Sequence, residues 1–163
     1  MIVIALGANL PSAAGGPQQT LEAALQRLEA SGVRVLGRSR WYRTAPVPVS
    51  EQPWFVNGVA RVETTLEPTA LLAVLQGLER EFGRQRTVAN AARTLDLDVI
   101  DYDGTVENTP ELTLPHPRMQ DRAFVLLPLA EIAPGWLHPT LGKTVESLIS
   151  ALPPEQKAEL ISP

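Results

Sequence analysis

The sequence predicts an α+β fold, and three observations carry the prediction. Four segments have the alternation or the short apolar run of a β-strand, and two segments between them have the spacing of an amphipathic helix. They follow the order strand, helix, strand, strand, helix, strand, which is the ferredoxin-like βαββαβ pattern with helices on one face of an antiparallel sheet. The chain of 163 residues, 44% of them hydrophobic, is long enough to bury a large core. We therefore expect one domain over residues 1–163, with helical decoration after the last strand.

The first strand, the first helix and the second strand are separated by glycine and proline. The run MIVIALG predicts a buried strand that ends at Gly7. After a loop, leucines and alanines recur at helical spacing from Gln18, and Gly32 lies where this helix should stop. Residues 33–44 predict the second strand, which ends at the proline-rich loop of residues 45–53.

The middle of the chain repeats this order. Residues 54–64 alternate and predict the third strand. A second helix begins near Pro68, a favoured first-turn residue, and ends at Gly83. Residues 84–92, RQRTVANAA, have no periodicity and predict an open loop. The fourth strand follows in RTLDLDVIDYDG and ends at a turn formed by Asp103 and Gly104.

The C-terminal part predicts the helical decoration. A helical stretch runs from about Asp121 to Ile132, and Pro128 within it predicts a break or a kink, because proline removes a main-chain hydrogen bond. A short helix is expected near residues 144–152, and a polar tail follows it.

Composition excludes several classes of protein. There is no cysteine, so neither a disulfide framework nor a thiolate metal site is expected. The first apolar run is short and has no basic region before it, unlike a signal peptide, and no segment approaches the ~20 apolar residues of a membrane span. A net charge of −4 argues against general nucleic-acid binding. We expect a soluble, cytoplasmic protein without nucleic-acid or membrane partners, and a monomer, because no apolar seam for a dimer is evident.

The fourth strand carries two carboxylates on one face. Asp96 and Asp98 are two residues apart, so in a strand they project to the same side, although aspartate is a poor strand former. Such a pair could hold Mg²⁺, and two such ions are the usual clamp for phosphoryl transfer. The alternative is a strand face that is acidic and exposed, and the two aspartates alone favour it. Asp101 and Asp103 are expected to be turn residues.

Basic and aromatic residues near this strand suggest further chemistry. Twelve of the fourteen basic residues are arginine, whose planar fork suits phosphate oxygens, although a solvated surface is an equal alternative. His116, between two prolines, could reach a phosphate or simply be exposed. Phe55 and Asn57 share a strand face and could stack on and hydrogen-bond a flat heterocycle, or could be a packed ring beside a structural amide. Because the chain has neither a Walker loop nor a GxGxxG motif, a nucleotide would be held by arginine and metal.

Six motifs together resemble one family. They are ALGANLP, RWYRTAPVP, QPWFVNGVARVET, LEREFGRQR, RTLDLDVIDYDG and LPHPRMQDRAFVLLPLAEIAP, and they extend from Ile2 to about Pro139. Their residues and order are similar to those of the 6-hydroxymethyl-7,8-dihydropterin pyrophosphokinases of folate biosynthesis. The resemblance implies a ferredoxin-like fold and the transfer of pyrophosphate from ATP to the hydroxymethyl oxygen of the pterin, with release of AMP.

The resemblance also implies the site residues. Two Mg²⁺ ions would be bridged by Asp96 and Asp98. The pterin would lie between Phe55 and Phe124, with its polar edge on Asn57 and on the turn from Thr44 to Val47. The nucleotide would contact Gln76, Glu79 and Val99, and its phosphates would meet Arg84, Arg93, His116 and Arg122. Residues 84–92 and 45–53 would act as lids, although VANAA lacks the Trp and Gly-Pro that many relatives carry there.

Two rivals to this interpretation stay open. A ferredoxin-like module that binds a ligand without catalysis would not need Asp and Arg clustered around one strand. Another Mg²⁺-dependent nucleotidyl or phosphoryl transferase would share that cluster but would not need Phe55 and Asn57 on one face.

Overall fold

The computed structural model describes residues 1–46, 50–83, 93–156 and 158–161. Within these residues the larger sheet has six strands in the order β5-β1-β4-β3-β8, with β2 also paired to β4, and all pairs are antiparallel. The strands are β1 (Ile2–Ala8), β2 (Arg34–Arg38), β3 (Tyr42–Thr44), β4 (Phe55–Glu63), β5 (Asp96–Tyr102) and β8 (Ala158–Leu160). The helices are α1 (Pro17–Ala30), α2 (Pro68–Glu81), α3 (Ala123–Ile132) and α4 (Val145–Ser150), and a separate ribbon pairs β6 (Glu107–Asn108) with β7 (Thr113–Leu114).

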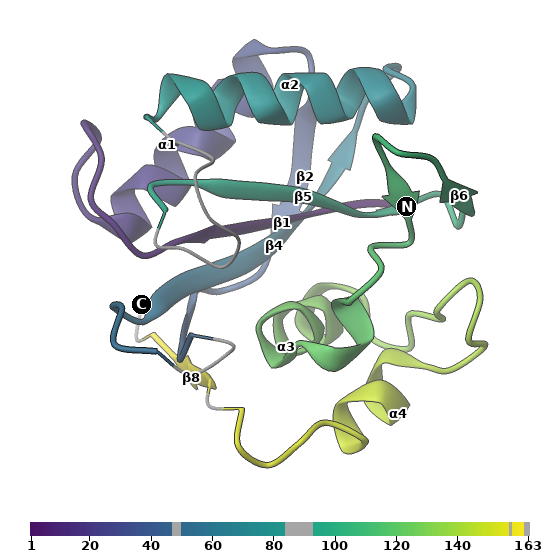
Figure 1. Cartoon of the computed structure of the whole chain (residues 1–163). Coiled ribbons are helices and arrows are strands. Elements are labelled where there is room, and N and C mark those ends of the chain that lie inside the picture. The colour runs from purple at the N-terminus through teal and green to yellow at the C-terminus, as the bar shows by residue number, and fades with distance from the viewer. Residues whose placement is uncertain (47–49, 84–92, 157, 162–163) are drawn as a thin grey trace.

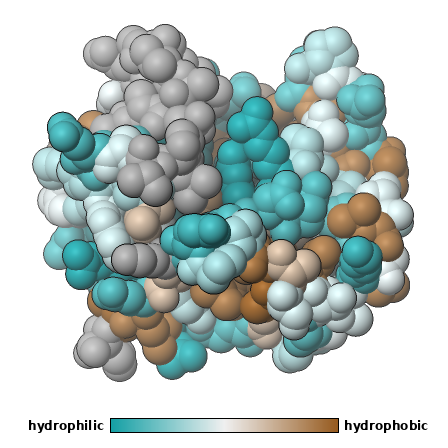
Figure 2. All heavy atoms as spheres, turned by 60° about the horizontal axis from the view of Figure 1, so that its bottom comes forward, coloured by the Kyte–Doolittle hydropathy of each residue, from teal (hydrophilic) through white to brown (hydrophobic). Residues whose placement is uncertain are grey.

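Helices cover both faces of the sheet. Figure 1 shows α1 and α2 on one face and α3 and α4 on the other. The strand order and the two crossover helices are those of the ferredoxin-like pattern, so the predicted fold class is confirmed. The C-terminal helices form a second layer over the sheet. With this layer turned forward, Figure 2 shows apolar patches interspersed with hydrophilic residues on the outer surface.

The side chains of β1 point alternately into two hydrophobic cores. Ile4 and Leu6 pack with Leu21 of α1 and Leu75 of α2, whereas Val3 packs on the other face with α3 and α4. A strand that is buried on both faces appears in the sequence as a continuous apolar run. This explains why MIVIALG shows no alternation.

The predicted second strand is in fact two strands, because one extra residue separates them. Arg38 pairs with Ala60 and Tyr42 pairs with Asn57, so the chain advances by four residues while β4 advances by three. Ser39 lies in this gap, where both its side chain and its main chain bond to β4. An extra residue of this kind bends a strand and redirects its side chains.

Of the break or kink predicted at Pro128, the break is wrong, because α3 runs from Ala123 to Ile132 without interruption. The proline cannot donate to the carbonyl of Phe124 one turn earlier. Pro128 is nevertheless buried with Leu129 in the second core, and this packing outweighs the lost bond. Among the described residues no helix, α3 included, combines the length and the apolar character needed to cross a membrane.

The predicted polar tail is also wrong, because part of it forms the edge strand β8. Ala158 lies opposite Thr44 and Leu160 lies opposite Tyr42. The three residues of β8 are half-buried or exposed, so no pattern of apolar residues marks them in the sequence. The strand is held by main-chain pairing, which sequence periodicity does not report.

Candidate active site

The register of three strands brings residues of two predicted sites to one end of the sheet. Gly7 of β1 pairs with Asn57 of β4 on one side and with Asp96 of β5 on the other. Residues that lie opposite each other in a sheet project to the same face, so Asn57 and Asp96 share the face that α3 covers. A Cβ on Gly7 would overlap Oδ1 of Asn57. The glycine therefore leaves an open floor between the two side chains.

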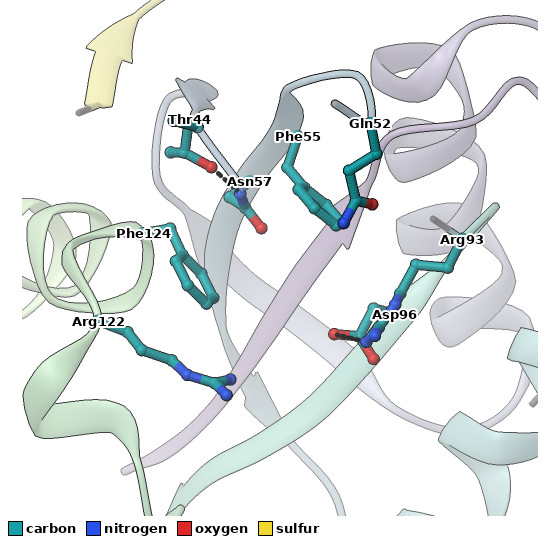
Figure 3. Close-up of a pocket in the computed structure, with 9 residues that line it drawn as sticks. Thr44, Gln52, Phe55, Asn57, Arg93, Asp96, Arg122 and Phe124 are labelled. Atoms are coloured by element: carbon teal, nitrogen blue, oxygen red, sulfur yellow. Dashed lines mark hydrogen bonds and ion pairs between the residues drawn. The ribbon is translucent and has the colours of Figure 1, made fainter. Parts of the chain in front are cut away.

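Two phenylalanines form the walls of a pocket above this floor. In Figure 3, Phe55 of β4 and Phe124 of α3 lie on opposite sides, and Asn57 lies between them at the back. Nδ2 of Asn57 donates a hydrogen bond of 2.6 Å to Oγ1 of Thr44, and both residues are buried. This bond fixes the orientation of the carboxamide. The lining residues are Thr44, Ala45, Gln52, Phe55, Asn57, Arg93, Asp96, Arg122 and Phe124. The pocket therefore has two aromatic walls and one polar edge, which suits a flat heterocycle.

The acidic pair lies beside this pocket. Asp96 and Asp98 project to the face of α3, whereas Leu97 and Val99 point into the core beneath α2. Oδ2 of Asp96 is 3.1 Å from a guanidinium nitrogen of Arg93, and the two side chains are 23% and 17% exposed. The prediction that the two carboxylates share one strand face is confirmed.

His116 is held close to the acidic pair as a neutral imidazole. Its main-chain N–H donates to the carbonyl of Ile100 at 3.1 Å, which docks the LPHP segment against β5. Its Nδ1 accepts the main-chain N–H of Arg118 at 3.3 Å, so the proton of the neutral ring is assigned to Nε2. Nε2 is 4.0 Å from Oδ2 of Asp98. Burial lowers the pKa of His116 to about 4, and the charge of Arg122 adds to this effect. At neutral pH the ring thus offers an N–H donor and no positive charge.

Arg122 extends from the start of α3 toward the same opening. Its guanidinium carbon lies 5.3 Å from the ring centroid of Phe124. Burial lowers the pKa of Arg122 and the charge of Asp98 raises it, and the group stays protonated because an arginine pKa starts above 12. Figure 3 shows Arg122 and Arg93 reaching the opening from opposite sides. Two guanidinium groups therefore flank the space between the pocket and the acidic pair.

Asn9 is a residue that the sequence reasoning missed. It is 3% exposed and joins three segments around the pocket. Its Nδ2 donates to Oε1 of Gln52 at 2.8 Å and to the carbonyl of Pro53 at 3.0 Å, and its Oδ1 accepts the main-chain N–H of Arg93 at 2.8 Å. Gln52, which was missed too, lines the pocket. The sequence signal for Asn9 was a carboxamide directly after a buried strand. Its role was missed because its partners Gln52 and Arg93 lie 43 and 84 residues away.

The residues predicted to contact a nucleotide lie outside the pocket, on α2 and β5. Glu79 is buried and accepts the main-chain N–H of Leu97 at 2.9 Å, which ties the start of β5 to α2. Gln76 lies one turn earlier and is half-buried. The side chain of Val99 is buried in the core, so only its main chain could contact a nucleotide. Two other predicted residues, Val47 and Arg84, and the whole loop 84–92 lie outside the described residues.

The donors that the site offers fit Mg²⁺. Asp96 and Asp98 supply carboxylate oxygens on one face, and Mg²⁺ usually takes one or two carboxylates together with phosphate and water oxygens. Within the described ranges no three residues among His, Asp and Glu gather into a metal-binding group. These side chains therefore suit a Mg²⁺ ion that binds together with a phosphorylated substrate. They suit less well an ion whose ligands all come from the protein.

Comparisons with known proteins identify the family of this chain. The model of the 7,8-dihydro-6-hydroxymethylpterin-pyrophosphokinase family matches residues 3–134. The chain is 40% identical to the 2-amino-4-hydroxy-6-hydroxymethyldihydropteridine pyrophosphokinase of Pseudomonas aeruginosa, over 93% of this chain and 91% of that protein. It is 36% identical to the folic acid synthesis protein fol1 of Pneumocystis carinii, over 90% of this chain but only 19% of that protein.

Solved structures show the same fold. An HPPK-DHPS crystal structure from Plasmodium falciparum superposes with a TM-score of 0.71 at 15% identity, over 91% of this chain and 44% of that chain. This likeness concerns the fold of the matched part. The family resemblance predicted from six motifs is confirmed by the family model and by the bacterial relative. The chain belongs to the 7,8-dihydro-6-hydroxymethylpterin-pyrophosphokinase family.

Proposed function

We propose that this chain, acting as one domain over residues 1–163, transfers the β,γ-pyrophosphoryl group of ATP to 6-hydroxymethyl-7,8-dihydropterin and releases AMP. The observation that carries the proposal is the junction of two half-sites. A pocket suited to a flat heterocycle opens directly onto two carboxylates, with a guanidinium group on each side. Membership of the family supports the same activity.

The pterin would bind between Phe55 and Phe124. Its ring would stack on both phenyl faces, and its amide edge would meet Asn57. The carboxamide has two N–H donors, one of which goes to Thr44, so the other N–H and Oδ1 can pair with the pterin. Main-chain groups of the turn from Thr44 to Val47 would complete this edge. The pocket thus orients the hydroxymethyl group toward the acidic pair.

The transfer itself needs positioning and charge neutralisation more than acid–base chemistry. The hydroxymethyl oxygen attacks the β-phosphorus of ATP, the bond from that phosphorus to the oxygen shared with the α-phosphorus breaks, and AMP leaves. The hydroxyl proton passes to solvent. Arg84, Arg93 and Arg122 would neutralise the phosphate charge. His116 would donate a hydrogen bond from its Nε2–H to a phosphate oxygen, and the proton would stay on the ring.

Asp96 and Asp98 would hold two Mg²⁺ ions. When bound, the ions neutralise phosphate charge and keep the attacking and leaving oxygens in line. The nucleoside part of ATP would lie along α2 and the edge strand β5, against Gln76, Glu79 and the main chain of Val99.

Product identity tests the proposal. Purified protein would be incubated with ATP, Mg²⁺ and hydroxymethyldihydropterin, and the nucleotides would be separated by chromatography. We expect AMP only when all three are present. ADP in place of AMP would mean simple phosphoryl transfer, and measurable pterin binding without any turnover would mean a binding module.

A further inference from the structure

We propose that Gln156 and β8 together act as a strap that positions the two walls of the pterin pocket, an inference that rests on the function proposed above. Gln156 bonds to the start of α3, which supplies the Phe124 wall. β8 pairs with β3, which in turn pairs with β4, the strand that supplies the Phe55 wall. The strap itself lies outside the set of residues that line the pocket. Its role is therefore one of positioning.

Gln156 caps the start of α3 from a distant part of the chain. The first N–H groups of a helix lack partners within the helix, and the residue before α3, Arg122, makes no side-chain cap. Oε1 of Gln156 accepts the main-chain N–H of Ala123 at 2.8 Å, and its Nε2 donates to the carbonyl of Asp121 at 2.5 Å. These two bonds fix the main chain on both sides of Arg122. They therefore set where the side chains of Arg122 and Phe124 begin.

β8 holds the opposite wall. Ala158 pairs with Thr44, and the main-chain N–H of Ile161 donates to the carbonyl of Trp41 at 2.9 Å. Thr44 accepts the hydrogen bond that orients Asn57. β3 has only three residues and lies between β4 and β8 in the sheet. Without β8 it would be an edge strand with one paired side.

The two contacts are close together in the chain, which couples the start of α3 to β8. Gln156 and Ala158 are two residues apart, so their Cα atoms can be separated by at most ~7 Å. Stacking on both faces of a heterocycle requires ring separations near ~3.5–4 Å, and a gap of ~0.5–1 Å already loses a quarter to a half of the attraction. The two coupled contacts therefore act on the main chain that carries Phe124 and on the strand beside Phe55, the two rings on which the pterin would stack.

Substitution of Gln156 tests the strap against a matched control. Gln156→Met keeps most of the side-chain volume and removes both hydrogen bonds. Thr144→Ala removes a cap at α4, where Oγ1 accepts the N–H of Ser147 at 3.2 Å, away from the pocket. We expect Gln156→Met to raise the KM for the pterin by roughly five- to tenfold, and the KM for ATP by less than about twofold. Thr144→Ala should lower Tm without changing either KM.

Further variants keep the test decisive. Gln156→Glu keeps the acceptor for Ala123 but loses the donor to Asp121, so its KM for the pterin should fall between those of Gln156→Met and the unaltered protein. Ile161→Pro removes the main-chain donor to Trp41 and tests the β8 contact in the full chain, and its KM for the pterin should also rise. If Gln156→Met leaves both KM values unchanged, or raises both by the same factor, the strap is overturned. The proposed function still stands in that case, provided that the unaltered protein forms AMP. An unaltered protein that forms no AMP would overturn both.

Discussion

Three aspartates of β5 differ in what they contact. Asp96 and Asp98 project toward the opening of the pocket, whereas Asp101 is buried. Oδ2 of Asp101 accepts the indole N–H of Trp136 at 2.9 Å, and Oδ1 accepts the main-chain N–H of Gly104 at 3.0 Å. The prediction that Asp101 is a turn residue is wrong, because it lies within β5 and is buried, although it does bond to Gly104 in the turn. Its bond to Trp136 depends on the second core and leaves no local pattern.

Substitutions along β5 should separate these roles. We expect Asp96→Ala and Asp98→Ala to abolish Mg²⁺-dependent AMP formation while the fold survives, since each removes one of two like charges. Asp96→Ala also breaks the ion pair with Arg93, so Asp98→Ala should be the more stable of the two variants. Asp101→Ala should lower the free energy of unfolding by ~1–3 kcal/mol, because it leaves a buried indole N–H unpaired, and should spare pterin affinity. Urea unfolding and AMP assays on all three variants make the comparison. An Asp96→Ala variant that unfolds would assign that residue a structural role.

Gly7 is the residue on which the floor of the site depends. Gly7→Ala adds one methyl group that would overlap Oδ1 of Asn57 and displace the carboxamide. We expect pterin affinity to fall at least about tenfold, which corresponds to ~1.4 kcal/mol. Gly37→Ala is the matched control, because a Cβ there would meet nothing within 4 Å. Calorimetric titration with the pterin should separate the two, and equal affinities would contradict the geometry.

Asn57 should distinguish the two substrates. Asn57→Ala is expected to weaken pterin binding by ~1–3 kcal/mol, because a polar edge of the ligand would be left unpaired. Binding of a non-hydrolysable ATP analogue with Mg²⁺ should be nearly unaffected. Asn108→Ala, at an exposed position of β6, serves as the control. Equal losses for both ligands would place Asn57 outside the pterin half-site.

At the scale of secondary-structure elements, periodicity predicts what is buried on one side. The stripes of leucines in α1 and α2 report packing against the sheet, and both helices lie where the sequence places them. β4 also lies where its alternation places it, although the middle of this central strand is buried on both faces. The extra residue at Ser39 and the strand β8 depend on main-chain bonds to distant residues. Side-chain patterns do not record such bonds, so both features were missed.

The same reason explains the site residues that were missed. Asp96, Phe55 and Asn57 stand out because their residue types are unusual for a strand or share a face. Asn9 and Gln52 meet only after β1 and β4 pair and bring together the loop that follows β1 and the loop that precedes β4. Motif resemblance proposes the roles of single residues, but it does not report which of them hold each other in place.

At the scale of the whole molecule, the site lies at the junction of the sheet and the second helical layer. β4 and β5 supply Phe55, Asn57 and the acidic pair, and α3 supplies Phe124. The second core, between the sheet and α3, therefore sets the distance between the two halves of the pocket. This layer is also the part of the molecule that acid should destabilise first.

Protonation of buried histidines should destabilise the fold. Burial lowers the pKa of His138 and also that of His116, the latter to about 4, whereas an unfolded chain titrates near ~6.5. The unfolded state binds more protons in that window, so the free energy of unfolding should decrease as pH falls from ~6.5 toward ~4. His138→Gln should reduce this dependence. Urea unfolding between about pH 7.5 and 5, in metal-free buffer, measures how the free energy of unfolding depends on pH. If the unaltered protein and His138→Gln show the same dependence, His138 is not one of the groups responsible.

The position of Gly7 also limits how the pocket of this chain can be altered. Gly7, whose side chain is a single hydrogen atom, adjoins both half-sites. A larger side chain at this position could not favour a different heterocycle without displacing Asn57 on β4. Selectivity for the ring must therefore change through the walls, at positions 55 and 124, which belong to different elements. Variant libraries aimed at new acceptors should vary these two positions together and leave position 7 untouched.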